Sequence, residues 1–322
     1  MSDPPFSVVI PSYNATATID SAIDSVLAQT REDFELIVVD DGSTDETPEL
    51  VERHCAADAR VKLIRQENQG TAGARNTGVG ASRGQFISFL DNDDLWMPNY
   101  LSAMSMALEE DPGAGFAYTD AWLLHDETKR LWRRGSLEHY PPIPPRCSAE
   151  EFLSRLIHMN FVMSSVTVRR SALEDVGTFD ASLKGVDDYD LWLRIVGAGY
   201  RAVQAPGRLL IQRDLPDSQS KDELLMIAGV RAVMARVVEE YDVPEAVREV
   251  ARQRLTTLDR WEGTVTGRDR FRAGLLGVRL RITGFIKTTW PSVYLRTTAP
   301  PDVAAAFPEL ARRGRSGPPG AI

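Results

Sequence analysis

Residues 7–14 read SVVIPSYN, and this stretch indicates the fold class. Residues 7–10 are mainly apolar and β-branched, so they predict a buried strand that ends at Pro11. The apolar residues that follow recur at the spacing of one helix face: Ile19, Ala22, Ile23, Val26 and Leu27. A strand followed directly by a helix is the unit from which parallel sheets are built.

The same unit repeats through the first 120 residues. Further elements are expected at residues 36–39 (strand), 47–57 (helix), 61–64 (strand), 86–90 (strand), 101–108 (helix) and 116–119 (strand). This alternation predicts an α/β fold with a mixed, mostly parallel sheet flanked by helices. In such sheets ligands bind beyond the carboxyl ends of the strands. Polar clusters follow three of those ends, at residues 11–14, 40–43 and 91–94, so we expect the functional site there.

The remainder of the chain is more helical. Its expected elements are a strand at residues 164–168 and helices at residues 149–157, 188–196, 224–240 and 244–260. Residues 122–146 and 160–165 are expected to be loops that shape the substrate pockets. The last two helices predict a helical extension at the C-terminus.

The composition excludes several classes of protein. The chain has 322 residues, 43% of them hydrophobic, so it is not a disordered chain, and its two cysteines cannot form a disulfide framework. A net charge of −9 argues against a nucleic-acid partner. The N-terminus shows no secretory signal and no apolar run reaches the roughly 20 residues of a spanning helix. Together these features predict a cytoplasmic protein.

The charge divides the chain into two parts. Residues 1–220 carry 20 basic and 34 acidic side chains, whereas residues 221–322 carry 17 basic and 12 acidic ones. We therefore expect an α/β domain over 1–220 and a basic helical extension over 221–322. Within the extension, residues 263–296 are basic, amphipathic and rich in aromatics. This pattern is typical of contact with the inner face of an anionic membrane, or of a helix that packs on the domain or on a second subunit.

Asp40 and Asp41 end a predicted strand, and two interpretations of them stay open. In the first, the segment that follows is a turn that caps the next helix through Asp45. In the second, a carboxylate at the strand end accepts a hydrogen bond from the imino group of a nucleobase.

Three carboxylates in four residues follow the strand at 86–90: Asp91, Asp93 and Asp94, with Asn92 between them. Such carboxylates repel one another unless a cation or a basic group compensates their charge. Mg²⁺ binds oxygen ligands and commonly uses one or two carboxylates together with substrate phosphates. The turn therefore predicts a metal site, and a solvated acidic turn is the alternative.

Two further segments complete the polar clusters. GTAGARNTG at residues 70–78 lacks the Lys-Ser/Thr of a P-loop but predicts the start of a helix, where Arg75 would meet a phosphate or would be an ordinary surface arginine. Asp187 and Asp188 begin another helix. Their clustering either favours the helix dipole or raises one pKa towards that of a general base.

In this order, the segments resemble the motifs of the family 2 glycosyltransferases, which are inverting enzymes with the GT-A fold. The similar stretches are SVVIPSYN at residues 7–14, VDDGSTD at 39–45, GARNTG at 73–78, FLDNDD at 89–94 and VDDYDLWLR at 186–194. The resemblance covers about residues 6–220. It implies that this part of the chain is a GT-A catalytic domain with Rossmann-like architecture.

The resemblance also implies roles for individual residues. Those near the nucleotide-sugar are Pro11, Tyr13, Asp41, Arg75, Asp91 and Asn92. Among them, Asp41 matches the aspartate that contacts the base, usually uracil. Asp93 matches the metal ligand of the Asp-x-Asp motif, and Asp188 matches the catalytic aspartate. Asp187 stands where glutamate is common in the family.

The implied metal site departs from the family pattern at one position. Family members often carry a histidine after the last core strand, whereas this chain has Leu215 there. Asp214 is the candidate oxygen ligand in its place, and the alternative is a shell made of Asp93, phosphates and water. The resemblance implies Mn²⁺ or Mg²⁺ as the cofactor.

The implied reaction is metal-dependent transfer of a sugar from a UDP-sugar to an acceptor hydroxyl, with inversion at the anomeric carbon. A glycan or a lipid-linked acceptor is expected, in the synthesis of a polysaccharide, a glycolipid or another cell-surface glycan. Two alternatives stay open, a non-catalytic nucleotide-sugar-binding protein and a sugar nucleotidyltransferase. The second is disfavoured because PSYN follows the first strand where a glycine-rich phosphate loop is usual. A homo-oligomer also stays open.

Overall fold

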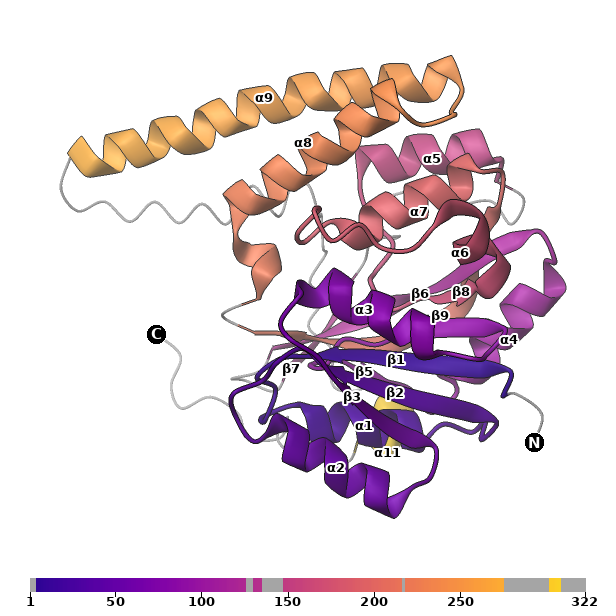
Figure 1. Ribbon diagram of the computed structural model, residues 1–322. Coiled ribbons are helices and arrows are strands. Elements are labelled where there is room, and N and C mark those ends of the chain that lie inside the picture. Colours follow the sequence, from indigo (N-terminus) through magenta and orange to yellow (C-terminus); the bar gives the residue numbers. More distant parts are fainter. Residues whose placement is uncertain (1–3, 126–129, 135–146, 216–217, 275–300, 308–322) are drawn as a thin grey trace.

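The computed structural model describes residues 4–125, 130–134, 147–215, 218–274 and 301–307. These residues form one mixed sheet with helices on both faces (Figure 1). Its strands are β1 (Phe6–Ser12), β2 (Phe34–Asp40), β3 (Val61–Arg65), β4 (Phe86–Phe89), β5 (Leu95–Trp96), β6 (Ala114–His125), β7 (Arg130–Arg134), β8 (Thr167–Arg169) and β9 (Arg201–Asp214). They lie in the order β3-β2-β1-β4-β8-β6-β9-β5, and β7 pairs with β6.

Helices connect most of these strands. They are α1 (Ile19–Leu27), α2 (Thr47–Ala57), α3 (Gly70–Ala81), α4 (Tyr100–Glu110), α5 (Ala149–His158), α6 (Arg170–Val176), α7 (Asp187–Gly197), the 3-10 helix η1 (Gln219–Lys221), α8 (Glu223–Glu239), α9 (Glu245–Gly274) and α11 (Pro301–Ala306). Among the helices of these described residues, none is both long and apolar enough to cross a membrane.

The strand order predicts a ligand site beside β1. The chain runs from β1 outward through β2 to β3, and then crosses to β4 on the other side of β1. Both β2 and β4 are parallel to β1, so the segments that leave β1 and β4 emerge at the same edge in different directions. In open α/β sheets a ligand binds at such a switch point. Residues 13–14 and 91–94 lie there.

The expected mixed sheet flanked by helices is confirmed. The first four strands pair in parallel: β1 with β2 and with β4, and β2 with β3. The strands β6 and β9 are also parallel. Antiparallel pairs enter through β8, which lies between β4 and β6, and through β5 at the end of β9. Antiparallel β5 matters for the site, because it follows the turn of residues 91–94 directly and anchors that turn on β9.

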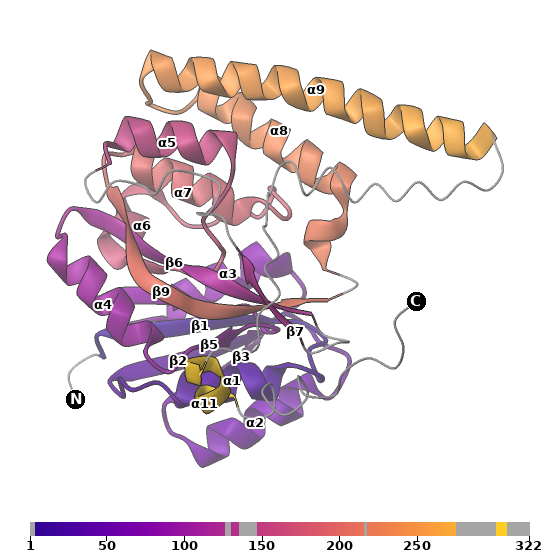
Figure 2. The same ribbon diagram turned by 180° about the vertical axis from the view of Figure 1, so that it is seen from behind.

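Helices lie on both faces of the sheet (Figure 2), and a large apolar cluster fills the space between the sheet and the helices on each face. One contains residues of α1, α2, α4 and α11, and the apolar face expected for α1 is buried within it. The other contains residues of α3, α5, α6, α7, α8 and α9. It includes Ile227 and Val233 of α8 together with Val186 and Tyr189 at the start of α7, so α8 and α9 share a core with α7.

Two local expectations are wrong. β1 continues through Pro11 to Ser12, because Pro11 faces the side on which β4 has already ended and its missing N–H is not needed there. Residues 122–125 and 130–134 are not a loop, since β6 extends to His125 and pairs with β7, and Leu124 and Leu131 are buried in the core. The rest of the expected loop, residues 126–129 and 135–146, and most of the basic segment, residues 275–296, lie outside the described residues.

Candidate functional site

The expected base-binding residues lie at the carboxyl ends of β1 and β2. Pro11 is buried within β1, whereas Tyr13 just beyond the strand is 48% exposed. Asn14 joins the two loops, because its Oδ1 accepts a hydrogen bond from the Thr44 N–H (2.9 Å) and its own N–H donates to Ser43 Oγ (2.9 Å). The loops after β1 and β2 are therefore held together beside an exposed aromatic ring.

Asp45 forms the turn before α2 that one interpretation of its segment predicted, although the N-cap position of the helix is Glu46 and not Asp45. Its Oδ1 accepts hydrogen bonds from the N–H (3.1 Å) and the hydroxyl (2.6 Å) of Thr47 at the start of α2, and its Oδ2 accepts one from the hydroxyl of Thr16. Although partial burial acts in the opposite direction, these bonds lower the pKa of Asp45 to about 2. Asp45 thus connects the loop after β1 to the start of α2.

Asp41 lies between the end of β2 and the start of α3, and only 3% of it is exposed. Its Oδ1 accepts hydrogen bonds from Gln66 Nε2 (2.7 Å) and from the Gln69 N–H (2.8 Å), and its Oδ2 accepts one from the Gly70 N–H (2.8 Å). The first N–H groups of a helix have no partner within the helix. Asp41 satisfies such groups of α3, and one of its roughly four acceptor positions remains.

The turn after β4 is held at both of its ends. Asp91 accepts hydrogen bonds from Arg75 Nη2 (2.7 Å) and from the Ser164 hydroxyl (2.6 Å). Asp94 is buried and accepts one from the backbone N–H of Arg213 on β9 (3.0 Å). Asn92 and Asp93 lie between these two anchors and are partly exposed. The two middle residues of the turn, Asn92 and Asp93, are therefore the ones accessible to a ligand.

The chemistry of the Asp93 carboxylate suits a cation. In the described ranges it makes no hydrogen bond or ion pair with another side chain. Burial and the negative charge of Asp91 raise its pKa to about 6, despite the opposing charge of Arg213. A divalent cation would relieve that repulsion, so the residues present fit one. No three His, Cys, Asp or Glu side chains of the described residues form a metal cage, so such a cation would take its other ligands from phosphate oxygens and water.

Arg75 joins this turn to the start of α7. Its Nη2 donates to Asp91, and its Nη1 donates to Asp187 Oδ2 (2.9 Å), although Asp187 lies 112 residues further along the chain. The arginine is 4% exposed and Asp187 is 5% exposed. The structure therefore brings together Arg75, Asp91 and Asp187, and their ion pairs fix the position of Asp188, the next residue of α7.

Asp188 has the character of a general base. It is half-buried, and one of its oxygens accepts a hydrogen bond from the N–H of Tyr189 (2.6 Å). Burial and the negative charge of Asp187 raise its pKa to about 7, although Arg75 acts in the opposite direction. A carboxylate with a pKa near neutrality is well suited to accept a proton from a hydroxyl.

Asp214 is committed to another partner. It ends β9 and forms an ion pair with Lys221 of η1 (Nζ to Oδ1, 2.7 Å), and the same Nζ donates to the carbonyl of Leu215. The segment that carries a histidine in the family is therefore fastened to η1. The neighbouring residue of this strand, Arg213, contacts the Asp91 turn: its backbone N–H donates to Asp94, and its Nη2 donates to the Ser21 hydroxyl of α1.

Sequence reasoning did not assign three residues that the structure brings to the site. Ser164 was expected to begin a strand but precedes β8, and it hydrogen-bonds Asp91. Asn76 follows Arg75 and exchanges two hydrogen bonds with the backbone of Phe179. Asn76 could have been found, because it lies inside the GARNTG motif. Ser164 and Phe179 carry no local signal, since their partners are distant in the chain.

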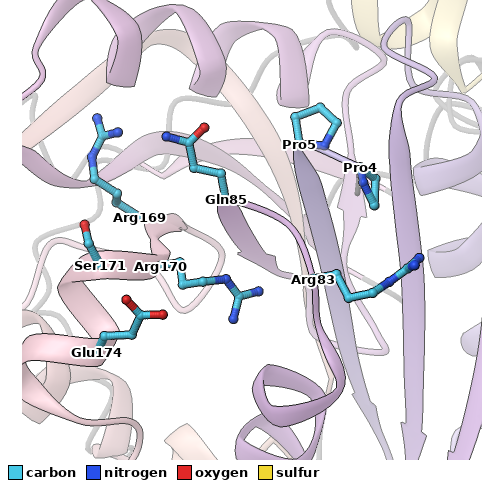
Figure 3. A pocket seen from close by; sticks show the side chains of 8 residues that line it. All are labelled: Pro4, Pro5, Arg83, Gln85, Arg169, Arg170, Ser171 and Glu174. Carbon is cyan, nitrogen blue, oxygen red and sulfur yellow. The ribbon is translucent and has the colours of Figure 1, made fainter. Parts of the chain in front are cut away.

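A surface hollow lies at the opposite end of the strands (Figure 3). Arg83, Arg169 and Arg170 are among the residues that line it, beside the amino ends of β1 and β4. Their guanidinium groups bind the protein itself: Arg83 pairs with Glu35, and the other two donate to backbone carbonyls. This hollow is remote from the carboxylates described above.

Comparison with known proteins identifies relatives of this chain. The model of the family described as "Glycosyl transferase family 2" matches residues 7–177, which is more than half of the chain. An uncharacterized glycosyltransferase of Rickettsia bellii is 34% identical over 197 residues, chondroitin synthase of Escherichia coli is 32% identical over 196, and the succinoglycan biosynthesis protein ExoO of Rhizobium meliloti is 34% identical over 207. These matches cover 60%, 61% and 63% of this chain. They cover 26%, 27% and 59% of the relatives, so the chain spans between about a quarter and three fifths of their length.

Solved structures share the fold at lower identity. TarS 1–349 of S. aureus has a TM-score of 0.62 at 19% identity, with 88% of this chain and 77% of that chain covered. The mannosyltransferase PcManGT of Pyrobaculum calidifontis, solved with GDP-Man and Mn²⁺, also has a TM-score of 0.62, at 20% identity, with 83% and 76% covered. These likenesses establish the fold, and the GT-A expectation is confirmed.

Proposed function

The chain belongs to glycosyl transferase family 2, and from this premise we propose that it transfers a sugar from a nucleoside-diphosphate sugar to an acceptor hydroxyl. The observation that carries the proposal is the pair of ion pairs made by Arg75, which join the turn of Asp93 to the helix start of Asp188. A candidate cation ligand and a candidate base thereby share one cluster. That arrangement suits a reaction in which a diphosphate leaves while a hydroxyl loses its proton.

In the proposed reaction, the acceptor oxygen forms a bond to the anomeric carbon while the bond from that carbon to the β-phosphate oxygen breaks. The acceptor's proton goes to Asp188, and the electron pair of the broken bond leaves with the nucleoside diphosphate. A single displacement of this kind inverts the anomeric carbon. The pKa of Asp188, about 7, supports its assignment as the base, because the carboxylate form is then available near neutral pH.

We assign a divalent cation, Mn²⁺ or Mg²⁺, to Asp93. Bound there, the cation would stabilise the negative charge of the leaving diphosphate as a Lewis acid. The raised pKa of Asp93 supports this assignment, and a neighbour in fold was solved with GDP-Man and Mn²⁺. Asp91 would hold the turn in position through its hydrogen bonds with Arg75 and Ser164. Asp214 is left out of the shell because it pairs with Lys221.

We propose a UDP-sugar as the donor. TarS, which shares the fold, was solved with UDP and with UDP-GlcNAc. The uracil would lie beyond β1 and β2, above the buried Pro11, where Tyr13 offers an exposed ring and Asp41 keeps one acceptor position for an imino N–H. Asn92, which is partly exposed beside Asp93, would contact the sugar-phosphate.

We also propose a glycan or lipid-linked acceptor in the synthesis of a polysaccharide or another cell-surface glycan. The names of two relatives, chondroitin synthase and a succinoglycan biosynthesis protein, support this class. A lipid-linked acceptor would bring the protein to the inner face of the membrane through residues 263–296. Replacing Arg279, Arg281 and Lys287 by Glu should then abolish flotation with anionic vesicles, and unchanged flotation would contradict membrane contact.

A screen for UDP release across sugar donors, with and without Mn²⁺, tests the proposal. We expect release that requires Mn²⁺, stops with EDTA and is lost in Asp188→Asn. Asp93→Asn should raise the Mn²⁺ concentration needed for half-maximal activity, whereas Asp214→Asn should not, because its carboxylate serves Lys221. Nucleotide binding without turnover would instead indicate a binding protein, and release of pyrophosphate would indicate a nucleotidyltransferase.

A further inference from the structure

We propose that Arg75 is a positioning residue: its guanidinium holds the turn that carries Asp93 against the helix start that carries Asp188, and it does not bind the donor. The inference rests on the proposed function, because it assigns a part within the same site. It differs from the role near the nucleotide-sugar that the family resemblance implies for this arginine.

The burial of Arg75 supports this role. It lies in the middle of α3, 4% exposed, with its guanidinium carbon 5.3 Å from the centre of the Phe179 ring. Each terminal nitrogen donates to a different carboxylate, and the buried Nε has no hydrogen-bond partner among the described residues. An arginine that binds a diphosphate needs its fork open towards the ligand. Here the fork is spread between two elements of the protein.

The charges of the cluster agree with a bridging role. The carboxylates of Asp91, Asp187 and Asp188 outweigh the effect of burial and raise the pKa of Arg75 above its ordinary value. In return, Arg75 opposes the burial that raises the pKa of Asp187 and of Asp188. One guanidinium therefore compensates several buried carboxylates, and without it the turn and α7 would repel each other.

Other residues of the GARNTG motif hold α3, and with it the backbone of Arg75, in place. Asn76 Nδ2 donates to the Phe179 carbonyl (2.8 Å), and the Phe179 N–H donates back to Asn76 Oδ1 (3.0 Å), so α3 also holds the loop that leads to α7. At Gly78, a Cβ would lie 2.3 Å from Val9 Cγ1, so the glycine lets α3 lie directly on β1. Arg75 is thus anchored to the sheet while it reaches the two carboxylate-bearing elements.

The test compares Arg75→Lys and Arg75→Gln with the wild type. Lysine keeps the charge, but its single ammonium does not reproduce a planar fork between two carboxylates. We expect kcat to fall about 100-fold in Arg75→Lys and further in Arg75→Gln, since small displacements of reacting groups have effects of that size. The affinity for UDP with Mn²⁺, measured by calorimetry, should stay at the wild-type value. The acid limb of the kcat profile should move to higher pH in Arg75→Gln, because the charge that lowers the pKa of Asp188 is lost.

The matched control is Arg83→Lys, which also alters an arginine paired with a carboxylate, but at the amino ends of the strands. Its kcat should match the wild type. If Arg75→Gln unfolds, the double variant Arg75→Gln/Asp187→Asn removes one charge of each sign and should show the same low kcat with unchanged UDP affinity.

One result overturns the inference: wild-type kcat with UDP affinity weaker by about tenfold or more in Arg75→Lys, which would make Arg75 a donor ligand. If the wild-type protein transfers no sugar from any donor, the proposed function fails instead. The UDP affinities then still decide between a positioning and a donor-binding arginine.

Discussion

Asn76 and Phe179, 103 residues apart, exchange two hydrogen bonds through which the side-chain amide of the first satisfies the backbone N–H and C=O of the second. The Asn76 amide pairs with both backbone groups of Phe179, as the backbone of a neighbouring strand would in a sheet. Phe179 itself lies in an irregular segment before α7. The segment that delivers Asp187 and Asp188 is therefore fastened to α3 by hydrogen bonds, and the Phe179 ring also packs edge-to-face against Phe89 of β4.

Asn76→Ala should destabilise the protein by about 1–3 kcal/mol, because it leaves two backbone groups of a partly buried segment without partners. It should also lower kcat while UDP affinity stays constant, since α7 begins a few residues later. Urea denaturation and steady-state kinetics would measure the two effects. Asn99→Ala is the control, because the Asn99 side chain makes no capping hydrogen bond to α4. Equal stability of the two variants would contradict the prediction.

The transfer rate should depend on the ionisation of Asp188. Burial and the Asp187 charge raise its pKa to about 7, and a base acts only when ionised, so kcat should rise with pH through about 7 and then level off. Below that value it should fall by about tenfold per pH unit. A profile from pH 5 to 9 would show the limb, and a kcat that stays constant down to pH 5 would exclude Asp188 as the base.

Glu35 should contribute stability that is lost in acid. This buried carboxylate accepts hydrogen bonds from Ser7, Lys62 and Arg83, which outweigh the opposing effect of burial and lower its pKa from 4.5 to about 2. The contribution is therefore fully present above pH 4.5 and disappears as the pH falls towards 2. Glu35→Gln should cost at most about 3 kcal/mol at pH 7, because Lys62 and Arg83 are half-exposed.

Urea titrations of the Glu35→Gln variant and the wild type at pH 7 and pH 3 would measure this difference. The gap between the two proteins should narrow at pH 3. A gap that is the same at both pH values would show that Glu35 gives no charge-dependent stability.

Gly229 should be intolerant of a side chain. In α8, a Cβ at this position would lie 2.7 Å from Val186 Cγ2, and Val186 immediately precedes Asp187. Gly229→Ala should therefore push α8 away from the start of α7, cost about 1–3 kcal/mol through overpacking and lower kcat. Figure 1 shows α8 passing beside α7.

Gly80→Ala is the matched control, because nothing lies within 4 Å of a Cβ at Gly80 of α3. It should stabilise the protein by about 0.5–1 kcal/mol through helix propensity alone. Thermal unfolding of both variants would measure the contrast. If Gly229→Ala also stabilises the protein, α8 is not closely packed on α7.

Elements with a strong local period were predictable. Residues 47–57 form α2 as expected, and the predicted helices at 149–157 and 188–196 match α5 and α7 to within one residue at each end. The apolar face of α1 is buried as its spacing indicates. The seven residues of α6 and the strand β7 were not predicted, because they depend on neighbours that are distant in the chain.

The polar clusters were predictable as a group, because parallel strands bring their carboxyl ends to one edge. Their individual tasks were not. Nothing local distinguishes Asp41, which satisfies the N–H groups of α3, from Asp93, whose carboxylate stays available beside Asp91. The difference arises from which donors the fold places next to each carboxylate.

Local chemistry along the chain was thus sufficient for most of the strands and helices of the first 120 residues, the edge at which the polar groups gather and the likeness to a family. Only the folded structure determined which carboxylates form ion pairs. It showed that Asp214 pairs with Lys221 and that Arg75 pairs with both Asp91 and Asp187. The physical reason is that periodicity and turn residues act over a few positions. Burial and side-chain pairing depend instead on groups that can lie more than a hundred residues apart, as Arg75 and Asp187 do, and that meet only when the sheet and its helices have packed.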